Sequence, residues 1–274
     1  MKMDKKAVIN SANLEEKIKL STEIIKEGFE RFGYEKIAIA WTGGKDSTTL
    51  LWLFKNVCND LSIPIPRCMF IDEGDVFNEI IEHVAKLKKE WNLNVAITKN
   101  ADVIGKAKKL GDIIKVKDLS ERNRQELINI NFEEDEFPFE PESYVGNHLM
   151  KTVPMKMFIE CNGIKALATA IRWDEQDARV EEVYFSPRDN PPHMRIHPIL
   201  HFKERDIWDN IHKNKLPFCK LYYLGYRSLG AKCSTKKFSD IAAWEQDLEN
   251  TTERGGRGQD KEAVMEKLRD LGYM

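Results

Sequence analysis

The residues with the clearest chemical signature form the segment Thr42 to Thr48, which reads Thr-Gly-Gly-Lys-Asp-Ser-Thr. An apolar run precedes it and predicts a buried strand, and apolar residues at helical spacing follow it. A glycine turn leading from a strand into a helix favours anions, because the first helical amides lack partners and the helix dipole is positive there. An ordinary strand–helix turn with a polar cap is the alternative. The candidate phosphate-binding residues are Ala40, Trp41, Thr42, Gly43, Gly44, Lys45, Asp46, Ser47 and Thr48.

Two common phosphate-binding motifs do not fit this segment. A Walker A loop needs a glycine five residues before Gly44 and a Ser or Thr after Lys45, where this sequence has Ile39 and Asp46. A dinucleotide-binding G-x-G-x-x-G motif is also absent at the turn. The sequence therefore excludes both motifs as the origin of an anion site here.

Charged residues directly follow two further predicted strands, one ending before Asp72 and the other before Arg172. Ligands of parallel sheets bind at the carboxyl ends of the strands, so we expect these residues near the glycine turn. Asp72 is suited to Mg²⁺ or a ribose hydroxyl, with capping of the next helix as the alternative. Arg172 is suited to two hydrogen bonds with a phosphate or sulfate, and Asp174 and Glu175 to orienting it or holding metal. A surface salt-bridge network is the alternative for this second cluster.

The elements that must position these residues alternate between strands and helices. Such strand–helix–strand units predict an α/β fold with a doubly wound, mainly parallel sheet and helices on both faces. The expected helices cover residues 13–32, 80–91, 149–161 and 201–211, with a further helix starting at residue 46. The expected strands cover residues 36–41, 68–71, 94–98, 164–171 and 196–200.

The segment 131–142 interrupts this alternation, because it combines six carboxylates with three phenylalanines and two prolines. We expect an inserted loop that takes no part in the core. A lid, a segment that docks a partner and a mobile spacer all remain open as its role.

Neither the histidines nor the cysteines form a convincing metal site. His193, His197 and His201 stand four residues apart, but prolines at 191, 192 and 198 argue against the helix that would align them. The five cysteines are scattered, odd in number and without a C-x-x-C motif. A zinc site and a disulfide framework therefore have little support.

Composition sets the wider limits. The chain has 274 residues, of which 42% are hydrophobic, and a formal net charge of −2. These values predict one large domain, or one domain with an appended piece, and no overall field that attracts nucleic acid or an anionic membrane. No apolar run reaches the roughly 18 residues of a membrane span, and no apolar segment follows the charged first residues as in a secretion signal. We expect a cytoplasmic protein.

Residues 42–47 resemble the PP-loop S-G-G-x-D-S of the ATP pyrophosphatases, which cleave ATP between its α and β phosphates. Later segments resemble the phosphoadenosine phosphosulfate (PAPS) reductase family of this superfamily, and within it the small subunits of sulfate adenylyltransferase. The matching segments are Arg172-x-Asp174-Glu175-x-x-x-Arg179, residues 203–208, residues 221–230 and residues 252–257 with the Gly272-Tyr273 ending.

The resemblance implies a fold with five parallel strands that binds ATP and Mg²⁺. It also implies attack of sulfate on the α-phosphorus, with the PP-loop holding the pyrophosphate that leaves. Met69, Phe70 and Ile71 are implied to contact adenine through their backbone. The implied catalytic residues are Lys45, Asp46, Arg172, Asp174 and Arg179. The implied phosphate and sulfate ligands are Arg172, Arg179, Arg227, Arg254 and Arg257, and the implied Mg²⁺ ligands are Asp72 and Asp174.

The same resemblance suggests how the chain is divided and with what it assembles. We expect a nucleotide-binding domain over residues 1–215 and an extension over residues 216–274 that completes the site. A GTPase partner subunit or a homo-oligomer is implied, whereas membrane and nucleic-acid partners are not.

Other chemistries share the PP-loop and remain as alternatives. Reductases of the family need a C-terminal Glu-Cys-Gly-Leu or paired cysteines, but this chain has no cysteine after Cys233, so reductase chemistry is disfavoured. An ATP-dependent thiolation enzyme would use Cys219 and Cys233 as sulfur carriers. Adenylyl transfer to a flavin phosphate, as in FAD synthetases, and a non-catalytic nucleotide-binding subunit are the remaining alternatives.

Overall fold

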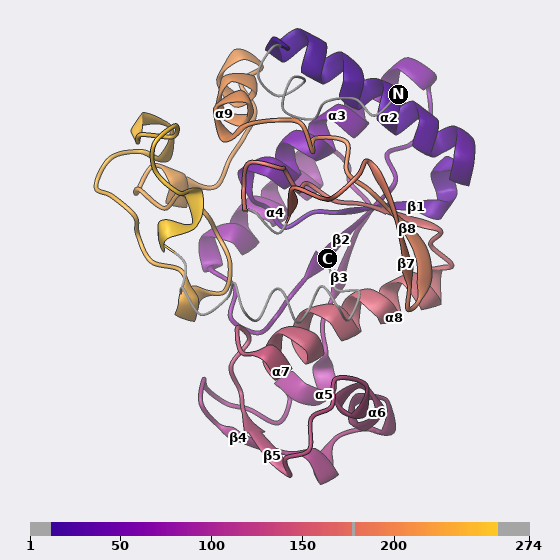
Figure 1. The fold of residues 1–274 in the computed structure, drawn as a ribbon, viewed down its shortest axis with the longest axis vertical. Coiled ribbons are helices and arrows are strands. Elements are labelled where there is room, and N and C mark those ends of the chain that lie inside the picture. Colours follow the sequence, from indigo (N-terminus) through magenta and orange to yellow (C-terminus); the bar gives the residue numbers. More distant parts are fainter. Residues whose placement is uncertain (1–11, 177–178, 257–274) are drawn as a thin grey trace.

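The computed structural model describes residues 12–176 and 179–256. Its centre is a six-stranded sheet with the order β3-β2-β1-β6-β8-β7 (Figure 1). All neighbouring strands are parallel except the edge strand β7, which runs antiparallel to β8. The strands are β1 Ile37–Ala40, β2 Arg67–Ile71, β3 Val95–Thr98, β6 Ala166–Ala168, β7 Phe185–Asp189 and β8 Pro192–Ile196. The expected doubly wound, mainly parallel α/β fold is confirmed, with one strand more than the resemblance implied.

Helices cover both faces of this sheet, because successive residues of a strand point to opposite sides. Ile37 and Ile39 of β1 pack into a core with the helices α2, α3, α4 and α9, whereas Ala38 packs against α8. Figure 1 shows α2, α3 and α9 on one side of the sheet and α8 on the other. These helices are α2 Leu14–Phe32, α3 Lys45–Leu61, α4 Asn78–Glu90, α8 Val153–Asn162 and α9 Glu204–Lys213.

The helix boundaries follow local signals in the sequence. Asn13 caps α2 and forms a capping box with Glu16, and Gly33 ends the helix, as predicted. Helix α4 instead begins after Phe77, which provides no side-chain cap. The alternative that the acidic cluster starting at Asp72 caps this helix is therefore wrong.

A lobe below the sheet has its own apolar core (Figure 1). It contains the acidic segment, whose strand β5 pairs with β4, and the side chains of Phe137 and Phe139 are buried in it. The expectation that this segment takes no part in a core was wrong, because Phe137 and Phe139 point inward while most of the carboxylates between and around them are exposed. The elements of this lobe are α5 Ala101–Ile104, β4 Ile113–Lys115, α6 Glu121–Asn129, β5 Glu136–Pro138 and α7 Tyr144–Asn147.

Three further boundaries differ from the expectations. A π-helix at His148–Thr152 joins α7 to α8, so helical structure begins before residue 149. The strand expected over residues 164–171 covers only Ala166–Ala168, which leaves the residues after it free to line a site. The strand expected over residues 196–200 was misplaced: β8 ends at Ile196, and it forms a hairpin with β7 that the sequence did not suggest.

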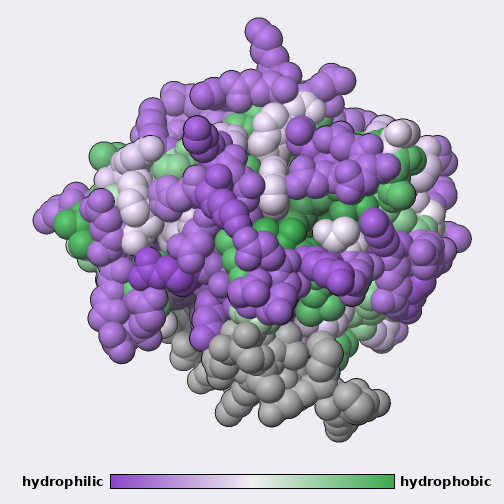
Figure 2. All heavy atoms as spheres, turned by 90° about the horizontal axis from the view of Figure 1, so that it is seen from above, coloured by the Kyte–Doolittle hydropathy of each residue, from purple (hydrophilic) through white to green (hydrophobic). Residues whose placement is uncertain are grey.

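Within residues 12–176 and 179–256, no helix combines the length and apolarity needed to cross a membrane. Figure 2 shows a face of the molecule that is largely covered by hydrophilic residues. The division of the chain at residues 215 and 216 stays a prediction.

Candidate functional site

The glycine turn lies between the end of β1 at Ala40 and the start of α3 at Lys45. Gly43 has a φ of +75°, which side-chain-bearing residues rarely adopt. A Cβ on Gly43 would also stand 2.9 Å from Cγ2 of Val84 in α4. Gly44, the N-cap of α3, has an ordinary φ of −76°. Gly43 therefore permits the tight turn and its packing against α4.

Hydroxyl groups accept hydrogen bonds from the amides of this turn. The Thr42 amide donates to Ser47 Oγ at 3.2 Å, and the Gly44 amide donates to Thr42 Oγ1 at 3.4 Å. The Lys45 amide donates to the buried Tyr222 hydroxyl at 2.9 Å. Burial raises the pKa of Tyr222 to about 12, so this hydroxyl stays protonated at neutral pH. The oxygens occupy positions at the helix N-terminus that suit the oxygens of an anion.

Two adjoining cavities open beside the turn. The first has a volume of about 340 Å³ and lies at the carboxyl ends of β1, β6 and β8; the second has about 260 Å³ and lies at the end of β2. The predicted residues in the wall of the second cavity are Ala40, Thr42, Met69, Phe70 and Ile71. The predicted residues in the wall of the first cavity are Ala40, Thr42, Gly44, Lys45, Asp46, Ser47, Ile71, Glu175, Arg179 and Arg254.

Some predicted residues of the turn face away from both cavities. Trp41 is fully buried in the core, and its Nε1 donates to Thr48 Oγ1 at 3.2 Å. Gly43 packs on α4 and is likewise in neither wall. The structure thus gives Trp41, Gly43 and Thr48 a part in shaping the turn, and nucleotide binding by them stays a prediction.

Charged side chains behind the turn form one network, most of whose members are buried, and we call it the charge cluster. At its centre the carboxylate of Glu253 binds both Lys45 Nζ and Arg172 Nη2. Burial alone would lower the pKa of Lys45, but the carboxylates of Glu253 and Glu204 outweigh it and raise the pKa. Lys45 is only 1% exposed, so its charge acts mainly inside the protein. The charge cluster consists of Lys45, Asp46, Arg172, Asp174, Glu204, Arg227 and Glu253.

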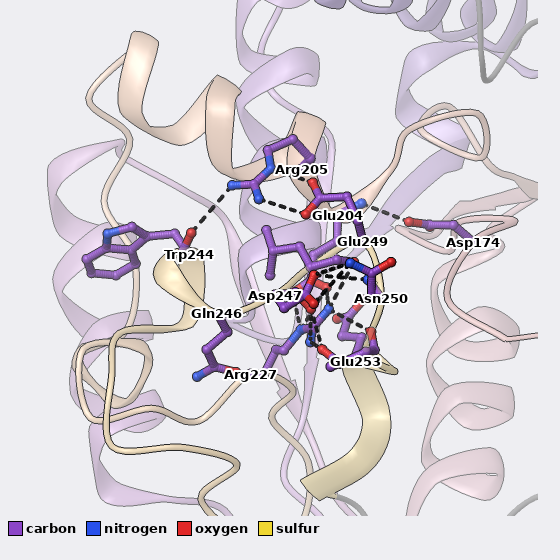
Figure 3. A network of polar contacts seen from close by, with 12 residues as sticks. Asp174, Glu204, Arg205, Arg227, Trp244, Gln246, Asp247, Glu249, Asn250 and Glu253 are labelled. Atoms are coloured by element: carbon purple, nitrogen blue, oxygen red, sulfur yellow. Dashed lines mark hydrogen bonds and ion pairs between the residues drawn. The ribbon is translucent and has the colours of Figure 1, made fainter.

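Arg172 and Arg227 are held by carboxylates of this cluster. The Arg172 side chain is fully buried and binds Asp46, Glu253 and, at 2.9 Å from Nε, Asp174. Arg227 binds Glu204 at 2.8 Å, at the centre of the network in Figure 3. Neither arginine is in the wall of the two cavities. The alternative of a surface salt-bridge network for Arg172 is wrong, because Arg172 and its partner Glu253 are both buried. Binding of substrate by these arginines stays a prediction.

Two other predicted arginines do line the first cavity. Arg179 and Arg254 share the carboxylate of Glu175, which Arg254 Nη1 approaches to 3.0 Å. The pair brings two guanidinium groups and one carboxylate to the same wall. The predicted ligand Arg257 lies outside the described residues, as does the Gly272-Tyr273 ending.

The predicted magnesium ligands fit such an ion poorly. One oxygen of Asp174 accepts from Arg172, and the other accepts from the Glu204 amide at 2.8 Å, at the start of α9. Asp72 accepts from the Gly74 amide at 3.0 Å and lines neither cavity. In the part of the chain that the structure describes, no group of three or more His, Cys, Asp or Glu residues could hold a metal ion. Binding of Mg²⁺ by Asp72 and Asp174 stays a prediction.

Sequence reasoning missed much of the far wall of the first cavity. The alternation of His193, Arg195 and His197 was noticed, but it was weighed only as a zinc pattern. The position of Thr169 and His197 directly after strands was the signal that could have found them. The cavity-lining residues without a predicted role are Asn147, Lys151, Met155, Thr169, Ala170, Ile171, Glu182, Arg195, His197, Tyr222, Ser228, Leu229 and Glu253.

The two cysteines considered for sulfur chemistry are poor nucleophiles in this structure. Desolvation and the neighbouring Asp75 carboxylate raise the pKa of Cys233 to about 12. Burial also raises the pKa of Cys219, whose side chain is fully buried. Because the thiolate is the reactive form, both environments oppose thiol catalysis.

Comparison with known proteins gives relatives that are enzymes acting on nucleotides. Sulfate adenylyltransferase subunit 2 of Rhodopseudomonas palustris (strain BisB18) is 25% identical over 240 residues, which cover 79% of this chain and 64% of the relative. A probable FAD synthase of Caenorhabditis elegans is 25% identical over 236 residues, which cover 85% of this chain and 36% of the relative. The chain thus spans between about a third and two thirds of the length of these relatives.

A solved structure shares the fold over nearly the whole chain. Candida glabrata FMN adenylyltransferase, in complex with FMN and the ATP analogue AMPCPP, matches with a TM-score of 0.60 at 17% identity. The match covers 95% of this chain and 82% of that one. The family described as the phosphoadenosine phosphosulfate reductase domain matches residues 36–237, and the chain belongs to this family.

Proposed function

We propose that this protein is an adenylyltransferase that cleaves ATP between its α and β phosphates and transfers the AMP group to an oxyanion acceptor. Sulfate is the first candidate acceptor. The observation that carries the proposal is the first cavity, where the glycine turn, the N-terminus of α3 and the pair Arg179–Arg254 meet at the carboxyl ends of parallel strands. The coarser assignment to nucleotide chemistry agrees with the relatives.

The two cavities divide naturally between the parts of ATP. The second cavity has an apolar wall that includes Phe70, Ile71 and Leu229, which suits adenine. The first cavity begins at Thr42, Gly44 and Ser47, whose amides and hydroxyls suit the pyrophosphate that leaves. Ala40 and Thr42 belong to both walls, so the nucleotide would run across the end of β1.

Catalysis in such a site would depend on position and charge. An acceptor oxygen attacks the α-phosphorus, and the bond from this phosphorus to the pyrophosphate breaks, so the bonding electrons leave with pyrophosphate. Arg179 and Arg254 are the candidates for stabilising the charge that develops, because they line the cavity beside the turn. The charge cluster, including Lys45, Asp46, Arg172 and Asp174, would hold the turn rigid. The Mg²⁺ that accompanies ATP would neutralise part of the phosphate charge.

A flavin phosphate is the second candidate acceptor. The relative named as a probable FAD synthase has the same identity, 25%, as the sulfate adenylyltransferase subunit. Reductase or thiolation chemistry has no comparable support, because the pKa of the Cys219 and Cys233 thiols is raised. The name "subunit 2" motivates a further part of the proposal, that this chain works with a GTPase partner subunit or as a homo-oligomer in the cytoplasm.

The test measures pyrophosphate release by the full chain from MgATP with sulfate, with FMN and with no acceptor. We expect release that depends on one acceptor and that falls at least tenfold in Arg254→Met. The control is Arg205→Met, which removes an exposed arginine paired with Glu249 at 2.9 Å, outside both cavities. If the protein binds AMPCPP but releases no pyrophosphate from MgATP with either acceptor, a non-catalytic nucleotide-binding subunit is favoured and the proposal is overturned.

A further inference from the structure

The end of the first cavity farthest along the sheet from β2 contains polar residues that the proposed reaction has not used. Thr169 follows β6 and His197 follows β8, and these neighbouring strands pair Ala168 with Ile196. The Thr169 amide donates to the Ile196 carbonyl at 2.9 Å, which holds the ends of the two strands together. Thr169 and His197 therefore stand side by side in the cavity wall, at the carboxyl edge of the sheet.

The imidazole of His197 has one nitrogen occupied and one without a hydrogen bond. Nδ1 lies 2.7 Å from Thr169 Oγ1. Nε2 makes no hydrogen bond to any described residue, although the side chain is only 1% exposed. The nearest carboxylate oxygen, on Glu182, is 3.6 Å away, which is too far for a good hydrogen bond. A buried polar atom without a partner in a cavity wall indicates a place for a ligand atom.

The surroundings of His197 suit a neutral donor beside a cation. Burial lowers the pKa of His197 to about 4 against the opposing effect of the Glu182 carboxylate, so the ring is uncharged at neutral pH. When the Thr169 hydroxyl donates to Nδ1, the ring proton lies on Nε2 and can be donated to a ligand. Arg195 lines the same cavity. Arg188 Nη2 lies 3.2 Å from Glu182 Oε1, so the charge of this carboxylate is balanced by an ion pair.

We propose that this end of the cavity is the subsite of the acceptor, and that His197, oriented by Thr169, donates its Nε2 proton in a hydrogen bond to an acceptor oxygen. The chemistry recognised is an oxyanion, which can be free sulfate or the phosphate of a monoester. The inference deepens the proposed function and rests on it. The histidine holds the acceptor and takes no proton, since an ionised acceptor attacks without losing one.

The test compares the binding of acceptors and nucleotide to matched variants. His197→Leu removes the donor, His197→Gln keeps an N–H group, and Thr169→Val removes the orienting hydroxyl with little change in volume. The control is His83→Leu, because His83 is a buried histidine on α4 that lines neither cavity and whose pKa burial also lowers to about 4. Binding of sulfate, and separately of FMN, is measured by equilibrium dialysis on protein saturated with AMPCPP and Mg²⁺.

We expect His197→Leu to weaken binding of one of the two acceptors about tenfold or more, as for a hydrogen bond to a charged group. His197→Gln should recover part of the loss, Thr169→Val should weaken binding less, and AMPCPP affinity should not change. Sulfate binding would identify the free ion, and FMN binding the monoester. The inference is overturned if His197→Leu and His83→Leu change acceptor affinity equally. It is also overturned if the wild-type protein binds AMPCPP but neither acceptor. Failure of the wild type to bind AMPCPP would instead refute the proposed function itself.

Discussion

Glu253 is the residue whose replacement tests the charge cluster most directly. Its carboxylate is the shared partner of Lys45 and Arg172, which are both nearly inaccessible to solvent. The two cations outweigh the cost of burial and hold the pKa of Glu253 well below its usual range. Glu253→Gln keeps the shape of the side chain but leaves the two cations with one negative charge fewer. We therefore expect stability and anion binding to change in opposite directions.

The size of both effects follows from burial. Removing one partner of a buried ion pair costs about 3–5 kcal/mol, which lowers the melting temperature by roughly 6–20 °C for a chain of this size. Glu253 lines the first cavity, so the uncovered positive charge also attracts an anion there. At about 7 Å and an effective dielectric constant of about 20, one unit charge contributes roughly 2 kcal/mol, or about thirtyfold in the affinity for pyrophosphate.

The assay is thermal unfolding together with calorimetric titration by pyrophosphate. Glu249→Gln is the matched control, because Glu249 lies close by in sequence and its side chain is 59% exposed in a surface pair with Arg205. Such a pair contributes at most about 1 kcal/mol. If Glu253→Gln melts and binds pyrophosphate like the control, the carboxylate does not balance these cations and the reasoning is refuted.

Three other perturbations follow from the structure. Gly43→Ala should lose about 1 kcal/mol or more in urea unfolding, because of the positive φ and the 2.9 Å approach to Val84, and an unchanged midpoint would contradict this. The free energy of unfolding should fall as the pH drops from about 6.5 to 4, because the histidines bind protons in the unfolded chain but stay neutral in the folded one. Urea unfolding at pH 7.5, 6 and 5 measures this change, and a stability that rises toward pH 5 would contradict it. Burial lowers the pKa to about 4 for the histidines His83, His193, His197 and His201. The double variant Cys219→Ser, Cys233→Ser should keep the full rate of pyrophosphate release, and its loss would point to thiol chemistry.

Local patterns in the sequence were sufficient for most of the fold. The apolar run before Thr42 and the helical spacing after it predicted β1 and α3, and Asn13 with Glu16 predicted the start of α2. The hairpin of β7 and β8 was missed, because its prolines and charged residues resemble a loop. The acidic segment was also predicted to be a loop, because its carboxylates outnumber apolar residues such as Phe137, which is buried.

The position of the candidate site could be predicted from the sequence, but the ion pairs between its charged side chains could not. The residues after β1 and β6 were expected at one edge of the sheet, and parts of both line the first cavity. The sequence suggested that Arg172 and Lys45 face a ligand, whereas the structure pairs them with Glu253, more than eighty residues away from either along the chain. No local pattern shows which of many carboxylates will balance a given cation.

The sequence alone determined that a glycine turn joins a strand to a helix, and that charged side chains follow the strands of a parallel sheet. Those features depend on residue spacing and on the backbone conformations that each residue allows, and both are local properties of the chain. Only the tertiary structure decided which cations are neutralised inside the protein, which ones line the cavity, and that Thr169 and His197 meet at its far end. These outcomes depend on burial and on contacts between distant segments, because the strength of a charge or a hydrogen bond is set by what surrounds it.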